Sequence, residues 1–262
     1  MIRRRTGDKL LRAYTWLVVL WLSAPIAVMI AFGFNDKQSK SNTTWQGFTL
    51  RWYEELFEIS DLSTALVNSL TIAVASTLVT AVIGTLLGLA LGRYRFRGKG
   101  LTNFLVFAAI STPELVMGAS LLSLFVSANL PRGHATIIIA HVLFSLSFVT
   151  VTVRARVITL DPSLEEAARD LGATSWGTFR QVTLPAIMPG VAAGAMLAFA
   201  LSIDDYVVTS FVNGSTMTFP LWIVGSVKTG IPPQVNVMGT IIFGVGVLIA
   251  VANAIAGRRR PT

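Results

Sequence analysis

The chain has no cysteine and little charge, because only 13% of its 262 residues are Asp, Glu, Lys or Arg. Without cysteine it has no disulfide framework, no thiolate nucleophile and no cysteine-ligated metal. Two histidines and few carboxylates make a poor basis for any metal site. Apolar residues are abundant instead: 53% of the chain is hydrophobic and the mean hydropathy is +0.67. This composition excludes disorder and is too apolar for a soluble domain.

Long stretches without charge indicate helices that cross a membrane. No residue between Asp61 and Arg93 is charged, and about 20 apolar residues suffice to cross about 30 Å of hydrocarbon. Lipid offers the backbone no hydrogen-bond partner, so each span must be helical. The stretches of sufficient length are 14–34, 65–91, 102–126, 135–153, 186–212 and 235–256. The sequence therefore predicts an all-α polytopic membrane bundle of six transmembrane helices.

The basic residues predict how this bundle is oriented. Sixteen of the 21 Lys and Arg residues lie before the first span or in 93–99, 154–180 and 258–260, and the loops of the opposite side carry five. The basic side is cytoplasmic in membrane proteins, so both termini are expected inside. A signal peptide is the alternative interpretation of residues 1–34. The apolar run is too long for one, and no convincing small-residue cleavage site follows, so we expect a retained span.

The longest cytoplasmic loop, 154–185, has strong local signals. Ser163 and Glu166 have the spacing of a capping box, which predicts the start of a short helix. Gly172 follows the good helix formers at the position where a left-handed C-cap is needed. The sequence therefore predicts a short helix that ends in a glycine turn.

A second short helix is expected after this turn. Thr174 or Ser175 can cap it, it would run through Gln181, and Pro185 would end it. A helix, a glycine and a second helix are also typical of DNA-binding helix-turn-helix units. A unit tethered at both ends to membrane spans could not lie in a DNA groove, so we expect no nucleic-acid partner. The remaining interpretations are a docking element for a cytoplasmic protein and an ordinary loop.

The same loop carries a recognisable motif. Glu166-Ala167-Ala168, three residues, Gly172, nine residues and Val182-x-Leu184-Pro185 resemble the EAA loop of ABC-importer permeases. The only departure from the motif is Val182 in place of isoleucine. The resemblance implies a coupling helix that sits in a cleft of an ATP-binding subunit. The coupling residues that it implies are Glu166, Ala167, Ala168, Gly172, Leu184 and Pro185.

The chain itself has no Gly-x4-Gly-Lys-Ser/Thr phosphate loop. The basic segment from Gly92 to Gly98 is flanked by glycine but lacks the Lys-Ser/Thr pair, and we interpret it as a cytoplasmic anchor. We therefore expect a transport subunit that is not an enzyme and holds no cofactor. ATP and Mg²⁺ would be bound by the partner subunit.

Further segments resemble the spermidine/putrescine permease family, in particular its second, C-type permease. They are Trp45–Tyr53, Arg93–Gly98, Leu201–Tyr206, Pro220–Val224 and Gly230–Asn236. The resemblance extends from about Trp45 to Ala256. It implies a type I ABC importer permease with the methionine-permease-like fold, in a bacterial cell membrane. The partners that it implies are a second homologous permease, two ATP-binding subunits and an extracytoplasmic solute-binding protein.

This resemblance also implies the domain organisation. The whole chain, 1–262, would be one transmembrane permease domain in contact with membrane lipid. A shared core of five spans would occupy about 65–256, with 14–34 as an additional N-terminal span and 154–185 as the coupling loop.

The predicted spans contain three charges, all of them acidic: Glu114, Asp204 and Asp205. A carboxylate inside a bilayer costs several kcal/mol, roughly, and normally lines a cavity or finds a partner. Carboxylates around one vestibule would attract an aliphatic polycation and bind its ammonium groups. Adjacent helical residues point about 100° apart, so one aspartate is expected to cap a break or bond a neighbouring span. His141 is expected to make an interhelical hydrogen bond.

Two alternatives to a polyamine importer stay open. The first is an ABC importer for another solute, although an anion would require Lys or Arg within the spans, which contain neither. The second is an ATP-independent channel or a membrane scaffold, which would not bind an ATPase through 154–185.

Overall fold

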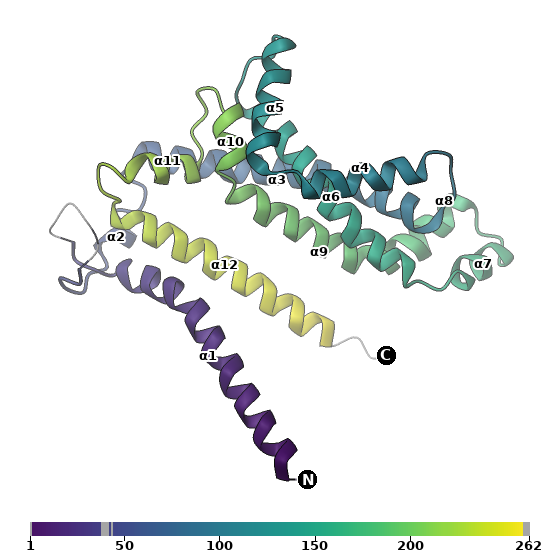
Figure 1. Ribbon diagram of the computed structural model, residues 1–262, viewed down its shortest axis with the longest axis horizontal. Helices are drawn as coiled ribbons and strands as arrows, with labels where there is room; N and C mark the ends of the chain where they lie inside the picture. The colour runs from purple at the N-terminus through teal and green to yellow at the C-terminus, as the bar shows by residue number, and fades with distance from the viewer. Residues whose placement is uncertain (1, 38–41, 43, 259–262) are drawn as a thin grey trace. The chain divides into compact units, whose positions relative to one another are not determined.

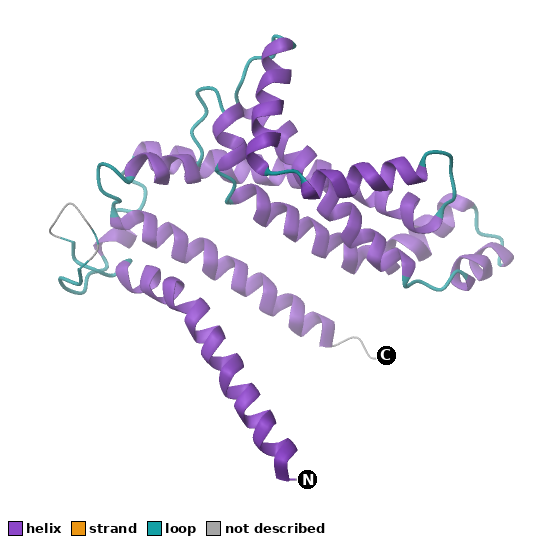
Figure 2. Cartoon of the chain, viewed as in Figure 1, coloured by secondary structure: helices purple, strands orange, loops and turns teal. Residues whose placement is uncertain are grey.

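The computed structural model describes residues 2–37, 42 and 44–258, which fold almost entirely into helices joined by loops (Figures 1 and 2). In chain order they are α1 (Ile2–Phe32), α2 (Arg51–Glu54), α3 (Ser60–Arg93), α4 (Lys99–Ser111), α5 (Glu114–Ser127), α6 (His134–Ile158), α7 (Ser163–Asp170), α8 (Ser175–Thr178), the π-helix η1 (Phe179–Thr183), α9 (Leu184–Ile203), α10 (Val207–Val212), α11 (Phe219–Ser226) and α12 (Pro233–Arg258). The predicted all-α class is confirmed.

The chain divides into two compact units. One combines Met1–Ser60 with Ile223–Thr262, and the other is the continuous segment Asp61–Trp222. The second unit contains the candidate coupling loop and all three carboxylates of the predicted spans.

Four helical stretches of the described chain are long and apolar enough to cross a membrane by themselves. They are Gly7–Phe32, Ser60–Arg93, His134–Ile158 and Ser175–Ile203. The apolar part of α12 that the structure describes, Pro233–Leu248, is shorter than such a stretch. Five crossings follow if the pair α4 and α5 counts as one, so the sixth span remains a prediction.

The stretch 102–126 was predicted as one helical span, and in the structure it is divided between two helices. α4 ends at Ser111, α5 begins at Glu114, and the two are bent by 110° at the break between them. Pro113 supplies the physical reason, because its ring prevents the preceding residue from adopting helical angles and its nitrogen donates no hydrogen bond. Thr112 accordingly has an extended backbone, with φ −75° and ψ 127°.

The stretch 186–212 contains a break, in agreement with the expectation that one of its aspartates caps a break or bonds a neighbouring span. α9 ends at Ile203 and α10 begins at Val207, so Asp204, Asp205 and Tyr206 form a break between two helices. Aspartate side chains compete for backbone N–H groups and thereby favour caps over helix interiors. The break therefore occurs where the span carries its charges.

In the second unit, α6 packs against both α3 and α9, and glycines allow both contacts. A Cβ atom on Gly88 of α3 would lie 2.9 Å from the carbonyl oxygen of Thr150, and one on Gly190 of α9 would lie 2.7 Å from Cβ of Arg156. Gly84, Gly92 and Gly194 are similarly close to α6. The absence of a side chain at these glycines allows close approach of the helices. Close approach is not seen at Gly244 and Gly246, where no described atom lies within 4 Å of such a Cβ.

In the first unit, α1 packs along α12, with Gly239 opposite Met29. Beyond α1 the buried side chain of Asn35 organises the turn: its Nδ2 donates to the carbonyl oxygen of Thr44 at 2.8 Å, and its backbone oxygen accepts from Nε1 of Trp52 at 2.7 Å. Nζ of Lys37 donates to the carbonyl oxygen of Ile231 at 3.1 Å, and burial lowers the pKa of Lys37.

Candidate functional site: the coupling loop and the intramembrane carboxylates

The first helix of the loop, α7, begins at Ser163, as expected, but the predicted capping box is wrong. The N–H of Glu166 donates to the carbonyl oxygen of Pro162 at 3.3 Å, and Oδ1 of Asp161 accepts the backbone N–H of Ser163 at 2.9 Å. This hydrogen bond lowers the pKa of Asp161. Asp161 thus accepts the N–H that a capping box assigns to the Glu166 side chain.

The turn after α7 has the predicted geometry at Gly172. Its φ is +86°, in the left-handed region, and no described atom lies within 4 Å of where a Cβ would be. The N–H of Ala173 donates to the carbonyl of Ala168 at 3.0 Å, and the N–H of Gly172 donates to the carbonyl of Arg169 at 2.8 Å. These two bonds are a Schellman motif, which satisfies the last carbonyls of the helix. Glycine is required here for its backbone conformation alone.

The second helix of the loop differs from the prediction at its end. Oγ1 of Thr174 accepts the N–H of Gly177 at 3.1 Å, so Thr174 is the cap. The helix does not end at Pro185. It continues from Ser175 through the wider π turn Phe179–Thr183 and into α9 without interruption. A π turn shifts the hydrogen bonding by one residue, which accommodates a proline without an N–H.

Some residues of the EAA-like motif are exposed, and others are partly buried. Glu166, Ala167, Gly172 and Pro185 are exposed, while Ala168 and Leu184 are partly buried. Leu184 packs against the core cluster of α3, α6 and α9, which contains the residues Leu89, Val149, Val153, Val157, Ile187 and Ala198. The loop therefore presents an outward surface on a helix that is continuous with α9.

Large apolar side chains on the outward surface are unusually exposed. The exposed fraction is 90% for Leu171, 68% for Trp176 and 51% for Leu164. Leu164 and Leu171 lie between the candidate spans His134–Ile158 and Ser175–Ile203, and Trp176 is the second residue of the latter. Exposed apolar patches on such a loop are typical of protein–protein contacts.

Asp205 is the aspartate that caps the break in the 186–212 stretch. Its side chain is 4% exposed, and its Oδ2 accepts the N–H of Thr209 at 2.7 Å and the Thr209 hydroxyl at 2.6 Å. Its Oδ1 accepts the N–H of Val208 at 3.3 Å. Asp205 therefore replaces the helical partners that the first N–H groups of α10 lack.

His141 of α6 joins this cap to two further helices. Its Nε2 lies 3.3 Å from Oδ2 of Asp205 and 2.9 Å from Oγ1 of Thr209, and its Nδ1 lies 2.6 Å from Oγ of Ser202. Oγ of Ser202 is 3.1 Å from Oγ of Ser76 in α3. Because the Thr209 hydroxyl already donates to Asp205, it accepts from the Nε2–H of His141. The expected interhelical hydrogen bond of His141 is confirmed.

The side chains of Asp204 and Glu114 are exposed, unlike the buried side chain of Asp205. Asp204 is exposed, and no other described residue donates a hydrogen bond to its carboxylate. Glu114 is also exposed and is the first residue of α5, where the positive end of the helix dipole favours a carboxylate. The three carboxylates thus divide into one buried cap and two open charges.

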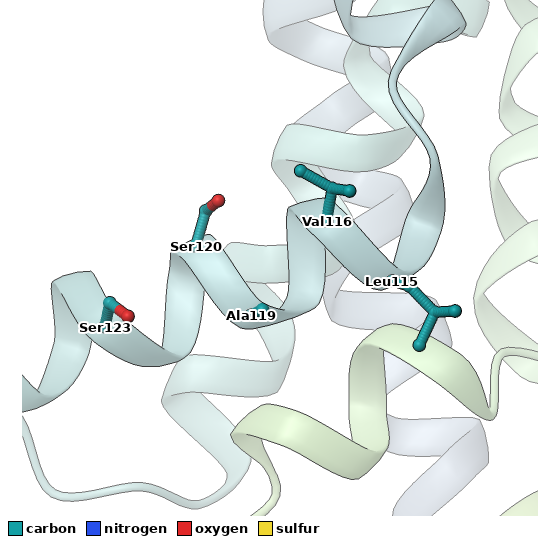
Figure 3. Close-up of a pocket in the computed structure, with 5 residues that line it drawn as sticks. All are labelled: Leu115, Val116, Ala119, Ser120 and Ser123. Atoms are coloured by element: carbon teal, nitrogen blue, oxygen red, sulfur yellow. The ribbon is translucent and has the colours of Figure 1, made fainter.

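A shallow depression with a volume of ≈ 380 Å³ follows Glu114 along α5 (Figure 3). It is lined by Leu115, Val116, Ala119, Ser120 and Ser123. On the opposite side of α5, Gly118 lies against the Phe211 ring of α10. One face of α5 thus packs against α10. The other face is open and carries both apolar side chains and hydroxyl groups.

The chain is similar to known permeases over most of its length. Residues 84–259 match the family described as "Binding-protein-dependent transport system inner membrane component". The spermidine/putrescine transport system permease protein PotC of Escherichia coli K12 is 40% identical over 253 residues, which are 96% of this chain and 95% of that protein. The putrescine transport system permease protein PotI of the same organism is 39% identical, over 87% of this chain and 86% of its own.

Solved structures agree with this similarity at the level of the fold. A chain of a bacterial ABC transporter involved in the import of alginate has a TM-score of 0.71 and 15% identity, covering 98% of this chain and 97% of that one. A chain of the MetNI methionine ABC transporter has a TM-score of 0.60 and 15% identity, covering 81% of this chain and all of its own. The predicted permease fold and family are confirmed: the chain belongs to the inner membrane components of binding-protein-dependent transport systems, among the spermidine/putrescine permeases.

Proposed function

We propose that this chain is the permease subunit of an ATP-driven importer and forms part of the translocation pathway for polyamines. The observation that carries the proposal is the nature of the charges in the spans predicted from the sequence: all three are carboxylates, and two of them, Glu114 and Asp204, are exposed. The names of its relatives PotC and PotI support polyamines as the substrate class.

The chemistry of the pathway follows from these groups. Polyamines are flexible chains with ammonium groups, which carboxylates bind by charge-assisted hydrogen bonds. Glu114 stands at the head of the depression along α5, where Ser120 and Ser123 offer hydroxyl oxygens as acceptors and the apolar side chains can contact methylene groups. Asp204 supplies a second open charge at the break after α9.

The energy would come from a partner. In this proposal the exposed surface of α7 and α8 docks on an ATP-binding subunit, which holds ATP and Mg²⁺, and Leu171 and Trp176 contribute apolar contacts. Glu166, Ala167 and Gly172 belong to the same surface. Because α8, η1 and α9 form one helix, a movement of the docked end is carried along a candidate span. The complete importer would contain a second permease, two ATP-binding subunits and a solute-binding protein.

Polyamine uptake tests the proposal directly. The chain is assembled with a partner permease, an ATP-binding subunit and a solute-binding protein, and reconstituted in vesicles with ATP inside. We expect labelled putrescine or spermidine to accumulate only with ATP, and glycine betaine, a sugar and an iron complex to stay outside. ATP-dependent accumulation of a control solute instead of polyamines would refute the substrate class. Uptake without ATP would favour a channel.

The orientation and the sixth span give a prediction of their own. Both termini, the loop 93–99 and the coupling loop are proposed to be cytoplasmic, with α12 as the sixth crossing. Single cysteines have no native background, since the chain contains none. In intact cells, we expect Thr174→Cys to resist an impermeant thiol reagent and Lys228→Cys to react. Reaction of Thr174→Cys from outside would reverse the orientation and remove the docking surface from the ATP side.

The glycine turn gives a second prediction. Gly172→Val puts a β-branched residue at φ +86°, which costs about 1–2 kcal/mol, or about a 5–30-fold loss in the population of the loop conformation. We expect ATP-driven uptake to fall by a similar factor while the chain remains in the membrane. Gly172→Asn is the matched control, because asparagine tolerates the left-handed region, and it should retain most activity. Equal uptake by Gly172→Val and wild type would contradict the role of this turn.

A further inference from the structure

Glu165, the residue before the motif glutamate, bonds residues of two other helical elements, α3 and η1. Its Oε2 accepts Nη2 of Arg93 at 3.2 Å and Nε of Arg93 at 3.3 Å. Its Oε1 accepts the Thr183 hydroxyl at 2.9 Å. Arg93 is the last residue of α3, and Thr183 is the last residue of the π turn that continues into α9. One carboxylate therefore links α7 to the cytoplasmic ends of two candidate spans.

This link is shielded from solvent, unlike most ion pairs of a loop. The exposed fractions of the two side chains are 17% for Arg93 and 15% for Glu165. Arg93 also reaches back to the carbonyl oxygen of Leu160, just before α7, at 3.5 Å. Charges that are paired, hydrogen-bonded and shielded interact more strongly than exposed ones, because water screens them less.

Apart from the bonds of Glu165, burial of side chains does little to fix the position of α7. No residue of α7, all of whose positions the structure describes, is buried. Adjacent residues on a helix point about 100° apart. Glu165 accordingly points to its own bundle while Glu166 is exposed, and no described residue pairs with the Glu166 carboxylate. Glu165 thus faces inward, and Glu166 faces the proposed partner.

We infer that Glu165 is a positioning residue for energy coupling, which makes α7 move as one body with the ends of α3 and α9. This inference rests on the proposed function of α7 as the docking element. The partner pushes on the exposed surface of α7. The bonds of Glu165 to Arg93 and Thr183 then carry that displacement into two spans, where the weak packing of α7 alone would let the helix tilt freely.

The test uses the complete reconstituted importer and measures both polyamine uptake and ATP hydrolysis. For Glu165→Gln and Arg93→Gln we expect uptake per ATP hydrolysed to fall at least tenfold. The ATP-binding subunit should still co-purify, and the solute-binding protein should still stimulate hydrolysis. The matched control is Glu55→Gln, which removes a more exposed i,i+4 pair with Arg51 in α2. It should leave the uptake-to-hydrolysis ratio of wild type unchanged.

Two rescue measurements separate coupling from a merely structural role. The swap Arg93→Glu with Glu165→Arg should recover most of the ratio that each single change loses. Independently, the pair Arg93→Cys and Glu165→Cys should be uncoupled until a short bifunctional thiol reagent bridges the two residues. Recovery by either route supports the inference.

The inference is overturned if Glu165→Gln couples as well as wild type, if neither rescue restores the ratio, or if the variants lose the ATP-binding subunit in proportion to uptake. These outcomes differ from a failure of the proposed function. If the wild-type importer shows no ATP-dependent polyamine uptake, both proposals fall together. If wild type transports and Glu165→Gln does too, only the role of Glu165 is refuted.

Discussion

Replacing Gly88 with valine is expected to remove most of the correctly folded protein from the membrane. A Cβ at this position would lie 2.9 Å from the carbonyl oxygen of Thr150, 2.9 Å from Cβ of Val153 and 3.0 Å from the backbone nitrogen of Arg154. Two of these three atoms belong to the backbone of α6 and cannot turn aside as a side chain could. Overpacking of this kind costs about 1–3 kcal/mol, and more where the backbone must move.

The effect of Gly88→Val is measured by the amount of monodisperse protein in detergent and by its thermal midpoint. Gly100→Val is the matched control, because Gly100 is also helical and no described atom lies within 4 Å of where its Cβ would be. We expect near-normal yield for Gly100→Val and a strong loss for Gly88→Val. Equal behaviour of the two variants would show that α3 and α6 do not depend on this close approach.

The sequence predicts the helical class and the longest spans well, because hydropathy and charge are properties of a whole segment. α3 and α6 follow from uninterrupted apolar runs, and both are confirmed. The same averaging hides breaks inside an apolar run. The bend at Pro113 and the gap after Ile203 leave the hydropathy high on both sides, so hydropathy alone places a single span over each stretch. A proline and a pair of aspartates were the local signals of these breaks.

The candidate coupling loop was predicted best where the cause is local. The left-handed turn at Gly172 follows from its place after a short helix, and the structure has it. The capping box failed because Asp161 competes for the same backbone N–H, which pattern spacing alone does not weigh. Pro185 was expected to end a helix, and the π turn that accommodates it has no recognised sequence signature.

The partners of contacts between distant segments could not be predicted from the sequence. Glu165 pairs with Arg93, 72 residues earlier in the chain, and His141 bonds Ser202 and Thr209, more than 60 residues later. Nothing in the local sequence distinguishes Glu165 from Glu166 except the helical angle between them. Such pairs become visible only when the packing of α3, α6 and α9 is known.

Asp204→Asn is expected to reduce polyamine uptake about ten- to a hundredfold, because a hydrogen bond to a charged group contributes about 1.5–3 kcal/mol. The change keeps the shape of an exposed side chain to which no other described residue donates a hydrogen bond. Membrane insertion and binding of the ATP subunit should therefore stay normal. Glu114→Gln is expected to behave in the same way, with a smaller effect if the two open charges bind different ammonium groups.

Asp205→Asn is expected to lower protein stability as well as uptake, whereas Asp204→Asn should lower uptake alone. This contrast tests the roles of the carboxylates most sharply. Asparagine would turn an N–H₂ group towards at least one of the groups that donate to Asp205, which are the N–H of Val208 and the N–H and hydroxyl of Thr209. A buried donor left unpaired costs about 1–3 kcal/mol, so yield and thermal midpoint should fall together with uptake. Normal uptake by Asp204→Asn, Glu114→Gln and Asp205→Asn would leave these carboxylates structural and remove the residue-level support for a polycation pathway. A loss confined to uptake in Asp205→Asn would instead mean that the buried cap opens to substrate during transport.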